Sequence, residues 1–278
     1  MENQRDKVVL ITGASSGIGR ACAEKLAEGP YIVYGTSRRP QTDWVTEDGT
    51  AKVRMLQMDV NEAASVEAGI EKILEEWRRI DIVVNNAGFG YGGAVEDTSI
   101  EEAKAAFETN LYGPLRACQA VLPTMRARGS GLIINVSSIG GRMGLPFQGI
   151  YSATKFALEG LTESLRMEVK SFGIDVVLLE PGDIRTSFTA NRCLTEASQS
   201  HEAYRDQCNV TLARIEEDEQ NGAAPQIVAE SLMRILRQAN PKPRYIAGRF
   251  HERLAVWAKD LLPDGLFERI LMINYSVE

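Results

Sequence analysis

A tyrosine and a lysine four residues apart are the side chains best spaced for chemistry. Tyr151 and Lys155 belong to the segment Tyr-Ser-Ala-Thr-Lys, and an i, i+4 spacing puts both on one face of a helix. A phenol with an unperturbed pKa of about 10 is a weak acid and a weak base at neutral pH. A neighbouring ammonium stabilises the phenolate and lowers that pKa, so the pair suits general acid–base work on a carbonyl or an alcohol. A surface pair without a role is the alternative.

Two further polar residues can assist the pair. Ser137 and Ser138 follow the apolar run Leu-Ile-Ile-Asn-Val, and the hydroxyl of either can hold a substrate carbonyl beside the phenol. Asn110 lies inside the helical stretch 99–128, although asparagine favours caps and turns. Its side-chain amide can hold a water that relays protons, and a local kink is the alternative. We expect Asn110, one of the two serines, Tyr151 and Lys155 to form one catalytic group.

A glycine-rich turn near the N-terminus indicates a bound phosphate. The run Gly-Ala-Ser-Ser-Gly-Ile-Gly directly follows the apolar strand pattern at 7–12 and opens the helical pattern at 17–28. Glycines let the backbone approach a pyrophosphate, while the free N–H groups and dipole of the helix supply positive charge. We expect a dinucleotide bound here by Gly13, Ser15, Ser16, Gly17, Ile18 and Gly19.

The end of the second strand pattern, at 31–36, decides which dinucleotide fits. A site for NAD usually places an acidic residue there for the ribose 2′-OH, whereas a 2′-phosphate needs arginine. The segment Gly-Thr-Ser-Arg-Arg carries no carboxylate. Arg38 can offer a planar, charged fork to a phosphate, with Ser16 and Ser37 as hydroxyl partners, while Arg39 is free to face water. The sequence predicts NADP(H).

Short motifs at two more strand ends fit the same cofactor. Asp59 and Val60 follow the pattern at 53–57, where a carboxylate can accept from an adenine amino group. Asn86, Ala87 and Gly88 follow the pattern at 81–84, and their small side chains let the backbone lie against a ribose. Each motif alone is also an ordinary turn. Open α/β sheets bind ligands at the carboxyl ends of their strands, so the repeated placement favours a site.

Apolar runs alternate with helical patterns along the chain. The strand patterns lie at 7–12, 31–36, 53–57, 81–84, 132–136, 174–179 and 244–247, and the helical ones at 17–28, 62–78, 99–128, 152–171 and 225–239. Continuous apolar strands separated by helices are typical of a parallel sheet covered on both faces. We predict an α/β fold: a single doubly wound Rossmann-type domain over 1–278, with about seven parallel strands and helices on both faces.

Two segments depart from this alternation. Residues 186–224 carry no strand pattern and follow the carboxyl end of a strand, where such folds keep substrate loops, so we expect a lid. A surface helix pair without a role is the alternative. Residues 249–278 form a helical tail with an apolar stripe. Most such stripes pack on their own domain, and a partner or membrane surface is the alternative.

Composition excludes several classes of protein. The 278 residues are 44% apolar and 25% charged, which is ordinary for a globular protein with a sizeable core. The net charge of −7 argues against a nucleic-acid partner. Four scattered cysteines and two histidines show no metal-ligand spacing, so we expect no metal and a reduced, cytoplasmic location. No apolar run approaches the roughly 20 residues of a transmembrane segment.

Taken together, these motifs resemble the short-chain dehydrogenase/reductase family over nearly the whole chain. The resemblance implies that Tyr151 is the acid–base, that Lys155 binds the nicotinamide ribose and that Ser138 orients the carbonyl. Asn110 would support the proton relay. A homodimer or homotetramer joined through 99–128 and 152–171 is also implied. The remaining residues that the resemblance assigns to the cofactor follow the strand pattern at 174–179: Pro181, Gly182, Ile184 and Thr186.

Within the family, the segments Gly-Leu-Pro-Phe at 144–147 and Phe-Ala-Leu-Glu-Gly at 156–160 are similar to 17β-hydroxysteroid dehydrogenases and retinol-dehydrogenase-like members. This implies a hydrophobic ketone, aldehyde or secondary alcohol, with a steroid or retinoid as one option. His201, near Tyr204 in the lid, can contact a substrate oxygen, or it is a surface histidine. The expected substrate residues are Ser138, Leu145, Phe147, Phe188 and His201.

The sequence therefore predicts an NADP(H)-dependent oxidoreductase. Two alternatives stay open. One is a catalytically silent NADP(H)-binding sensor or scaffold of the same fold. The other is a nucleotide-sugar epimerase or dehydratase on the same scaffold, although those relatives generally carry a larger C-terminal substrate region.

Overall fold

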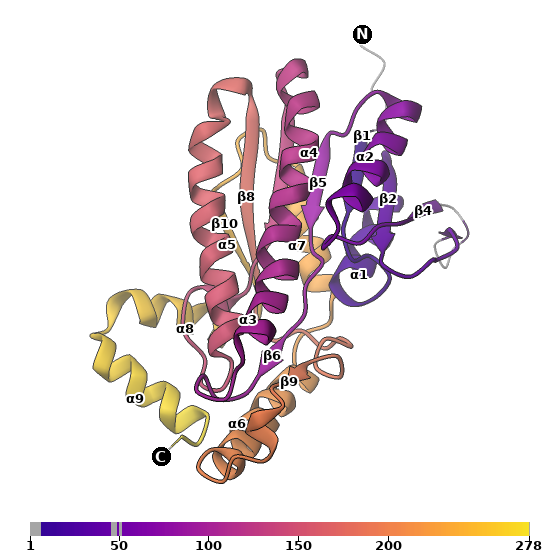
Figure 1. Cartoon of the computed structure of the whole chain (residues 1–278). Helices are drawn as coiled ribbons and strands as arrows, with labels where there is room; N and C mark the ends of the chain where they lie inside the picture. Colours follow the sequence, from indigo (N-terminus) through magenta and orange to yellow (C-terminus); the bar gives the residue numbers. More distant parts are fainter. Residues whose placement is uncertain (1–6, 46–48, 50–51, 278) are drawn as a thin grey trace.

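An eight-stranded sheet with helices on both faces runs through the molecule (Figure 1). The computed structural model describes residues 7–45, 49 and 52–277. Across the sheet the order is β10-β8-β7-β5-β1-β2-β4-β3. The seven predicted strands all form and pair in parallel, as β1 (Lys7–Ile11), β2 (Tyr31–Ser37), β4 (Lys52–Gln57), β5 (Ile82–Asn85), β7 (Gly131–Val136), β8 (Ile174–Pro181) and β10 (Arg244–Ala247).

The eighth strand, β3 (Trp44–Val45), was not predicted. It pairs antiparallel with β4 at the edge of the sheet. Two residues are too few to give an alternating pattern, so the sequence carried no signal for it. The sheet is therefore mixed, with one short antiparallel edge on a parallel body.

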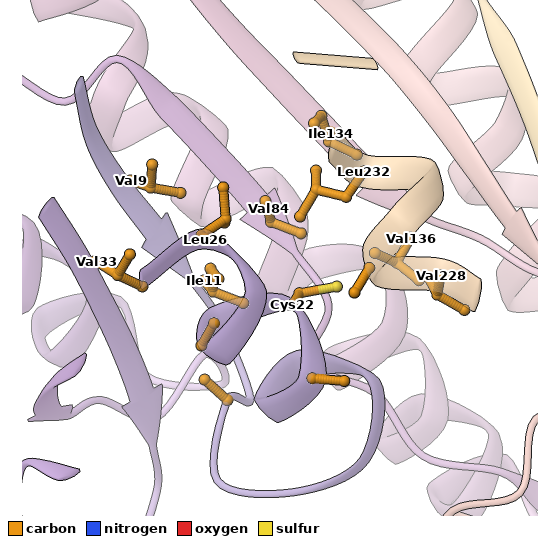
Figure 2. Close-up of a cluster of buried hydrophobic side chains, with 14 of the residues drawn as sticks. Val9, Ile11, Cys22, Leu26, Val33, Val84, Ile134, Val136, Val228 and Leu232 are labelled. Carbon is orange, nitrogen blue, oxygen red and sulfur yellow. The ribbon is translucent and has the colours of Figure 1, made fainter. Parts of the chain in front are cut away.

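Each face of the sheet has its own apolar cluster, and β1 divides its side chains between them. Val9 and Ile11 pack under α1 (Gly17–Ala27) and α7 (Gln226–Leu236), in the cluster that Figure 2 shows with Cys22 and Leu232. Val8 and Leu10 point to the opposite cluster. Since successive strand side chains alternate between faces, a strand that is covered on both must be apolar throughout. The second face is covered by α2 (Ala63–Trp77), α4 (Gly113–Arg128) and α5 (Gly149–Glu168).

The predicted helix 99–128 is interrupted. It consists of α3 (Ile100–Phe107), a π-helical turn η1 (Glu108–Tyr112) and α4. Ser99 and Glu102 form a capping box that begins α3. Asn110 lies in the π turn, so the local kink that was given as the alternative for this residue is present. Single π turns inside helices are frequent at functional sites.

The segment 186–224 is more ordered than expected. Its strand β9 (Cys193–Leu194) pairs with β6 (Tyr91–Gly92) in a separate two-stranded sheet, so the expectation of no strand was wrong. A short 3₁₀ turn, η4 (Ala197–Gln199), and helix α6 (Arg205–Gln220) follow. In Figure 1, α6 and β9 lie at the end of the molecule where the carboxyl ends of the strands meet.

The helical tail consists of α8 (Phe250–Leu261) and α9 (Asp264–Asn274). Val256 and Phe267 are buried against Met143, as expected for a stripe that packs on its own domain. Other apolar side chains of the stripe stay exposed, among them Trp257 and Leu261. Within the described ranges, no helix combines the length and the apolar character needed to cross a membrane.

Candidate active site

A cavity of about 700 Å³ opens at the carboxyl ends of the strands. It lies by the loops after β1 and β5, where the strand order reverses and open α/β sheets bind their ligands. Most residues predicted to bind the cofactor line it: Gly13, Ser15, Ser16, Gly17, Ile18, Ser37, Arg38, Val60, Asn86, Ala87, Gly88, Tyr151, Lys155, Pro181, Gly182, Ile184 and Thr186.

The glycine turn at the base of the cavity is built by contacts between two loops. Gly13 has a φ of +66°, and a Cβ at this position would lie 2.9 Å from the Cα of Ala87. Thr12 Oγ1 accepts from the backbone N–H groups of Asn86 and Ala87, at 2.9 and 3.0 Å. The Asn86 amide donates back to Thr12 O and Gly13 O. Gly19 lies beside this amide inside α1 and does not line the cavity, so its contribution is to the packing of the turn.

The end of β2 offers positive charge to the cavity. Arg38 and Arg39 both line the wall and are exposed. The first carboxylate after β2 is Asp43, which accepts from the backbone N–H of Met55 at 2.7 Å and pairs with Lys52 at 2.8 Å. The Asp43 carboxylate therefore points away from the cavity. Among the described residues, none of those that line the cavity at the end of β2 is acidic.

Asp59 is half-buried and does not line the cavity. Its Oδ1 accepts from the backbone N–H of Asn61 at 3.0 Å, which makes it the first residue of a local turn. Its contact with an adenine amino group stays a prediction.

Tyr151 and Lys155 face the cavity from the first turns of α5. Lys155 Nζ lies 5.9 Å from the centre of the Tyr151 ring and donates to the backbone carbonyl of Val136 at 3.0 Å. Ser138 begins the 3₁₀ turn η2 (Ile139–Gly141), where its Oγ accepts from the backbone N–H of Gly140 at 3.0 Å. All three predicted side chains share one wall of the cavity.

Burial dominates the electrostatics of this group. It raises the pKa of Tyr151 to about 12, although a hydrogen bond with Ser138 acts in the opposite direction. It lowers the pKa of Lys155 to about 8, against the opposing charge of Glu159. The sequence led us to expect a lowered pKa for Tyr151. The pKa is raised instead because burial removes more hydration energy from the phenolate than the hydrogen bond with Ser138 restores.

Asn110 links the loop after β5 to helix α5 through the hydrogen bonds of its side chain. Its side-chain N–H groups donate to Phe89 O at 3.0 Å and Thr154 Oγ1 at 3.1 Å, and its Oδ1 accepts from Phe89 N at 3.1 Å. Thr154 in turn donates to the carbonyl of Tyr151 at 2.7 Å. Asn110 is 1% exposed and does not line the cavity. The observed contacts position the loop after β5 against α5, and the relay of protons through a water stays a prediction.

The expected substrate residues separate into two groups. Leu145 and Phe188 line the cavity, and the Phe188 ring meets Tyr151 edge-on at 5.8 Å between centres. Phe147 and His201 do not line it, which corrects our expectation. Phe147 turns into the apolar cluster beneath α6. His201 lies outside, where its Nδ1 is 2.5 Å from Asp97 Oδ1.

Several residues of the cavity were not predicted from the sequence. Asp183, Asp218, Glu219 and Tyr275 line the wall near Tyr151. Burial and the negative charges of Glu252, Asp218 and Glu219 raise the pKa of Asp183 to about 7. Asp183 directly follows Pro-Gly, which is the one signal that the sequence offered. The others come from α6 and from the end of the tail, and no spacing pattern relates them.

The fold and the Tyr151–Lys155 pair define a class of protein, an oxidoreductase that acts on C–OH or C=O groups with a nicotinamide cofactor. The profile of the family described as short chain dehydrogenase matches residues 7–197. The chain belongs to this family.

Individual relatives extend the match beyond residue 197. The chain is 43% identical over 271 residues to a 3-ketodihydrosphingosine reductase of Bacteroides thetaiotaomicron, covering 98% of both proteins. It is 37% identical over 257 residues to 17-beta-hydroxysteroid dehydrogenase type 1 of Homo sapiens, covering 86% of this chain and 76% of that protein. A crystal structure of a short-chain dehydrogenase from Streptomyces avermitilis superposes with a TM-score of 0.81 at 31% identity, covering 99% and 97% of the two chains.

Proposed function

We propose that the protein is an NADP(H)-dependent oxidoreductase that moves a hydride between the nicotinamide and a hydrophobic ketone, aldehyde or secondary alcohol. The observation that carries this proposal is that a single cavity joins the glycine turn to Tyr151, Lys155 and Ser138. The chain's own geometry fits a dinucleotide, because the left-handed Gly13 and the start of α1 leave backbone N–H groups free for a pyrophosphate.

The end of β2 favours NADP(H) over NAD(H). Arg38 reaches the cavity with its fork available, and Ser16 and Ser37 add hydroxyl groups to the same region. Asp43, the residue that could hold a ribose 2′-OH by its charge, is turned to Met55 and Lys52. A 2′-phosphate suits this arrangement better than a free hydroxyl.

Each residue of the site has one task in the reductive direction. The bound cofactor supplies the hydride. The hydroxyl groups of Ser138 and Tyr151 polarise the carbonyl oxygen, and Tyr151 then gives its proton to that oxygen, which is worth roughly 10²–10⁴ in rate. The ammonium of Lys155 stabilises the phenolate that remains. A pKa of about 12 keeps Tyr151 protonated at neutral pH, so the site is prepared to donate.

The acidic residues that line the cavity favour a particular class of substrate. A 3-ketodihydrosphingosine, the substrate in the name of the Bacteroides relative, is a ketone with a neighbouring amine and a long alkyl chain. Glu219 and Asp218 are already paired with Arg192 and Arg214, at 2.5 and 3.2 Å. Asp183, whose arginine neighbour Arg249 lies 3.6 Å away, would attract the ammonium of such a molecule, whereas a steroid has no charge to match it. Leu145 and Phe188 offer apolar surface to the chain. We infer that a long-chain amino ketone is preferred over a steroid or retinoid.

Three broader expectations belong to the same proposal. Residues 186–224 act as the substrate lid, and they contribute Phe188 and Glu219 to the cavity wall. A homodimer or homotetramer through α4 and α5 is supported by the exposed Phe156 and Met167 on α5. A cytoplasmic location agrees with the free state of the four cysteines.

The test measures NADPH oxidation by the purified protein against matched carbonyls. The panel contains a long-chain 2-amino-3-ketone, the same ketone without the amine, a steroid ketone and a retinal, with Tyr151→Phe as the blank. We expect turnover of the amino ketone that is lost in the variant, while NADPH still binds. Asp183→Asn should lower kcat/KM for the amino ketone about tenfold and leave the ketone without the amine unchanged.

Other results would contradict parts of the proposal. Retained turnover in Tyr151→Phe would refute the mechanism. Tight NADPH binding without turnover of any carbonyl would favour the silent sensor. Release of a product at constant NADPH would favour an epimerase or dehydratase that recycles its cofactor.

A further inference from the structure

A buried charged cluster lies behind Lys155, on the side away from the cofactor turn. Glu159 follows Lys155 by one turn of α5, Glu180 belongs to β8, and Arg244 belongs to β10. Glu159 is 5% exposed and Glu180 is fully buried. Arg244 Nη1 donates to both carboxylates, to Glu180 Oε1 at 2.6 Å, and its Nη2 donates to the exposed Glu163 at 2.5 Å.

Several buried polar atoms of the cluster lack a well-formed hydrogen bond among the described residues: Glu159 Oε1, Glu180 Oε2 and Ser137 Oγ. The Ser137 hydroxyl is nevertheless close enough to Glu159 to act on its pKa, which it lowers. A Cβ on Gly141 would lie 2.7 Å from Ser137 Oγ and 3.2 Å from Glu159 Oε1, so this glycine leaves the space into which both atoms face. A buried oxygen without a partner costs about 1–3 kcal/mol, which points to a proton or a small polar occupant in this space.

The local charges do not balance. Glu159, Glu163 and Glu180 face Arg244. Arg142, from the loop after β7, lies 3.9 Å from Glu180 but is itself paired with Asp260 of α8. Two buried carboxylates that share one guanidinium nitrogen cannot both ionise easily. Burial and the charge of Glu180 accordingly raise the pKa of Glu159 to about 7.

Lys155 is the cation that faces this cluster from α5. Burial lowers its pKa to about 8, and the charge of Glu159 acts to raise it. The i, i+4 spacing brings the two side chains to neighbouring positions on one helix face. The titrations of the two residues are therefore linked.

We propose, on the basis of the function proposed above, that Glu159 is a positioning residue whose carboxylate keeps the Lys155 ammonium charged, and that Glu180 and Arg244 set when this carboxylate is ionised. An ionised Glu159 opposes the loss of the Lys155 proton as the pH rises, so the pair extends the pH range in which the site is ready to act.

The direct test follows the protonation of Lys155 itself. Protein labelled with ¹³C in its lysines reports the titration through the ¹³Cε chemical shift, and Lys155→Met assigns the signal. Loss of an opposite charge at this separation shifts a pKa by on the order of one unit. We expect the Lys155 midpoint to fall by about one pH unit in Glu159→Gln and to recover in Glu159→Asp.

Two matched variants separate charge from mere packing. Glu163→Gln removes an exposed partner of the same arginine and should leave the midpoint unchanged. Glu180→Gln lets Glu159 ionise at lower pH, so the midpoint of Glu159, followed through its ¹³Cδ chemical shift, should fall; this measurement still tests the cluster if Glu159→Gln does not fold. An unchanged Lys155 midpoint in Glu159→Gln, an unchanged Glu159 midpoint in Glu180→Gln, or an equal shift of Lys155 in Glu163→Gln would overturn the proposal.

Turnover provides a second measure of the same variants. The basic limb of kcat against pH should move to lower pH in Glu159→Gln by the same amount as the Lys155 midpoint, while KM for NADPH changes little. If the wild-type protein reduces no carbonyl, the proposed function fails, but the titration of Lys155 still tests the role of Glu159.

Discussion

Reversing the charge of Arg38 should change which cofactor the protein binds. Arg38 is exposed, lines the cavity at the end of β2, and has no carboxylate partner among the described residues. Its charged hydrogen bonds to a 2′-phosphate are worth about 1.5–3 kcal/mol. An aspartate there would add a repulsion of roughly 1 kcal/mol through water at about 5 Å, reduced by salt.

These terms sum to about 3 kcal/mol for NADPH, which is more than 100-fold in Kd. NADH carries no 2′-phosphate, and an acidic residue is the usual partner of its ribose. We therefore expect Arg38→Asp to weaken NADPH binding by about two orders of magnitude and to leave NADH binding equal or slightly tighter. Titration of the fluorescence of the reduced nicotinamide measures both Kd values directly.

Two further variants control for the change of charge. Arg253→Asp makes the same replacement at an exposed residue of α8 and should alter neither Kd. Arg39→Asp, at the neighbouring exposed arginine, should cost less than Arg38→Asp. Equal losses for NADPH and NADH in Arg38→Asp would refute the assignment of a 2′-phosphate site, and a larger loss in Arg39→Asp would move that site by one residue.

Three other changes test the physical reasoning about the site. Asn110→Ala leaves the backbone groups of Phe89 without partners, so urea unfolding should show a loss of about 2–4 kcal/mol in stability. Gly13→Val forces a branched residue into a φ of +66° against Ala87, so NADPH binding should weaken at least about tenfold while circular dichroism shows an intact fold. Asp183 has a pKa of about 7 in the folded protein, well above its ordinary value, so its ionisation destabilises the protein as the pH rises toward 7. Asp183→Asn should therefore raise the unfolding free energy by at least about 2 kcal/mol more at pH 8 than at pH 4, because the penalty accumulates between the unfolded and the folded pKa; a gain of the same size at both pH values would contradict this.

The parallel strands were predictable because each must be apolar on both faces. Val8, Val9, Leu10 and Ile11 are all fully buried, and such a run is visible in the sequence. Motifs that follow parallel strands necessarily meet at one edge of the sheet, so the sequence alone is enough to bring the glycine turn and Arg38 together.

Other features depend on packing that no local pattern encodes. The strands β3, β6 and β9 have two residues each, too few for a period. Phe147 looked like a pocket residue by its position, yet its backbone with φ of 55° turns the ring toward α6. The raised pKa of Tyr151 follows from burial by residues distant in sequence, and a motif of five residues carries no information about that burial.

The place of Tyr275 has a consequence for alterations of the C-terminal helices. This side chain lines the cavity, and its carbonyl accepts from Thr211 of α6 at 3.1 Å. The glycine turn is held by other contacts, between Thr12 and the backbone of Asn86 and Ala87. A change that loosens α9 would therefore open the substrate end of the cavity while the nucleotide end keeps its shape.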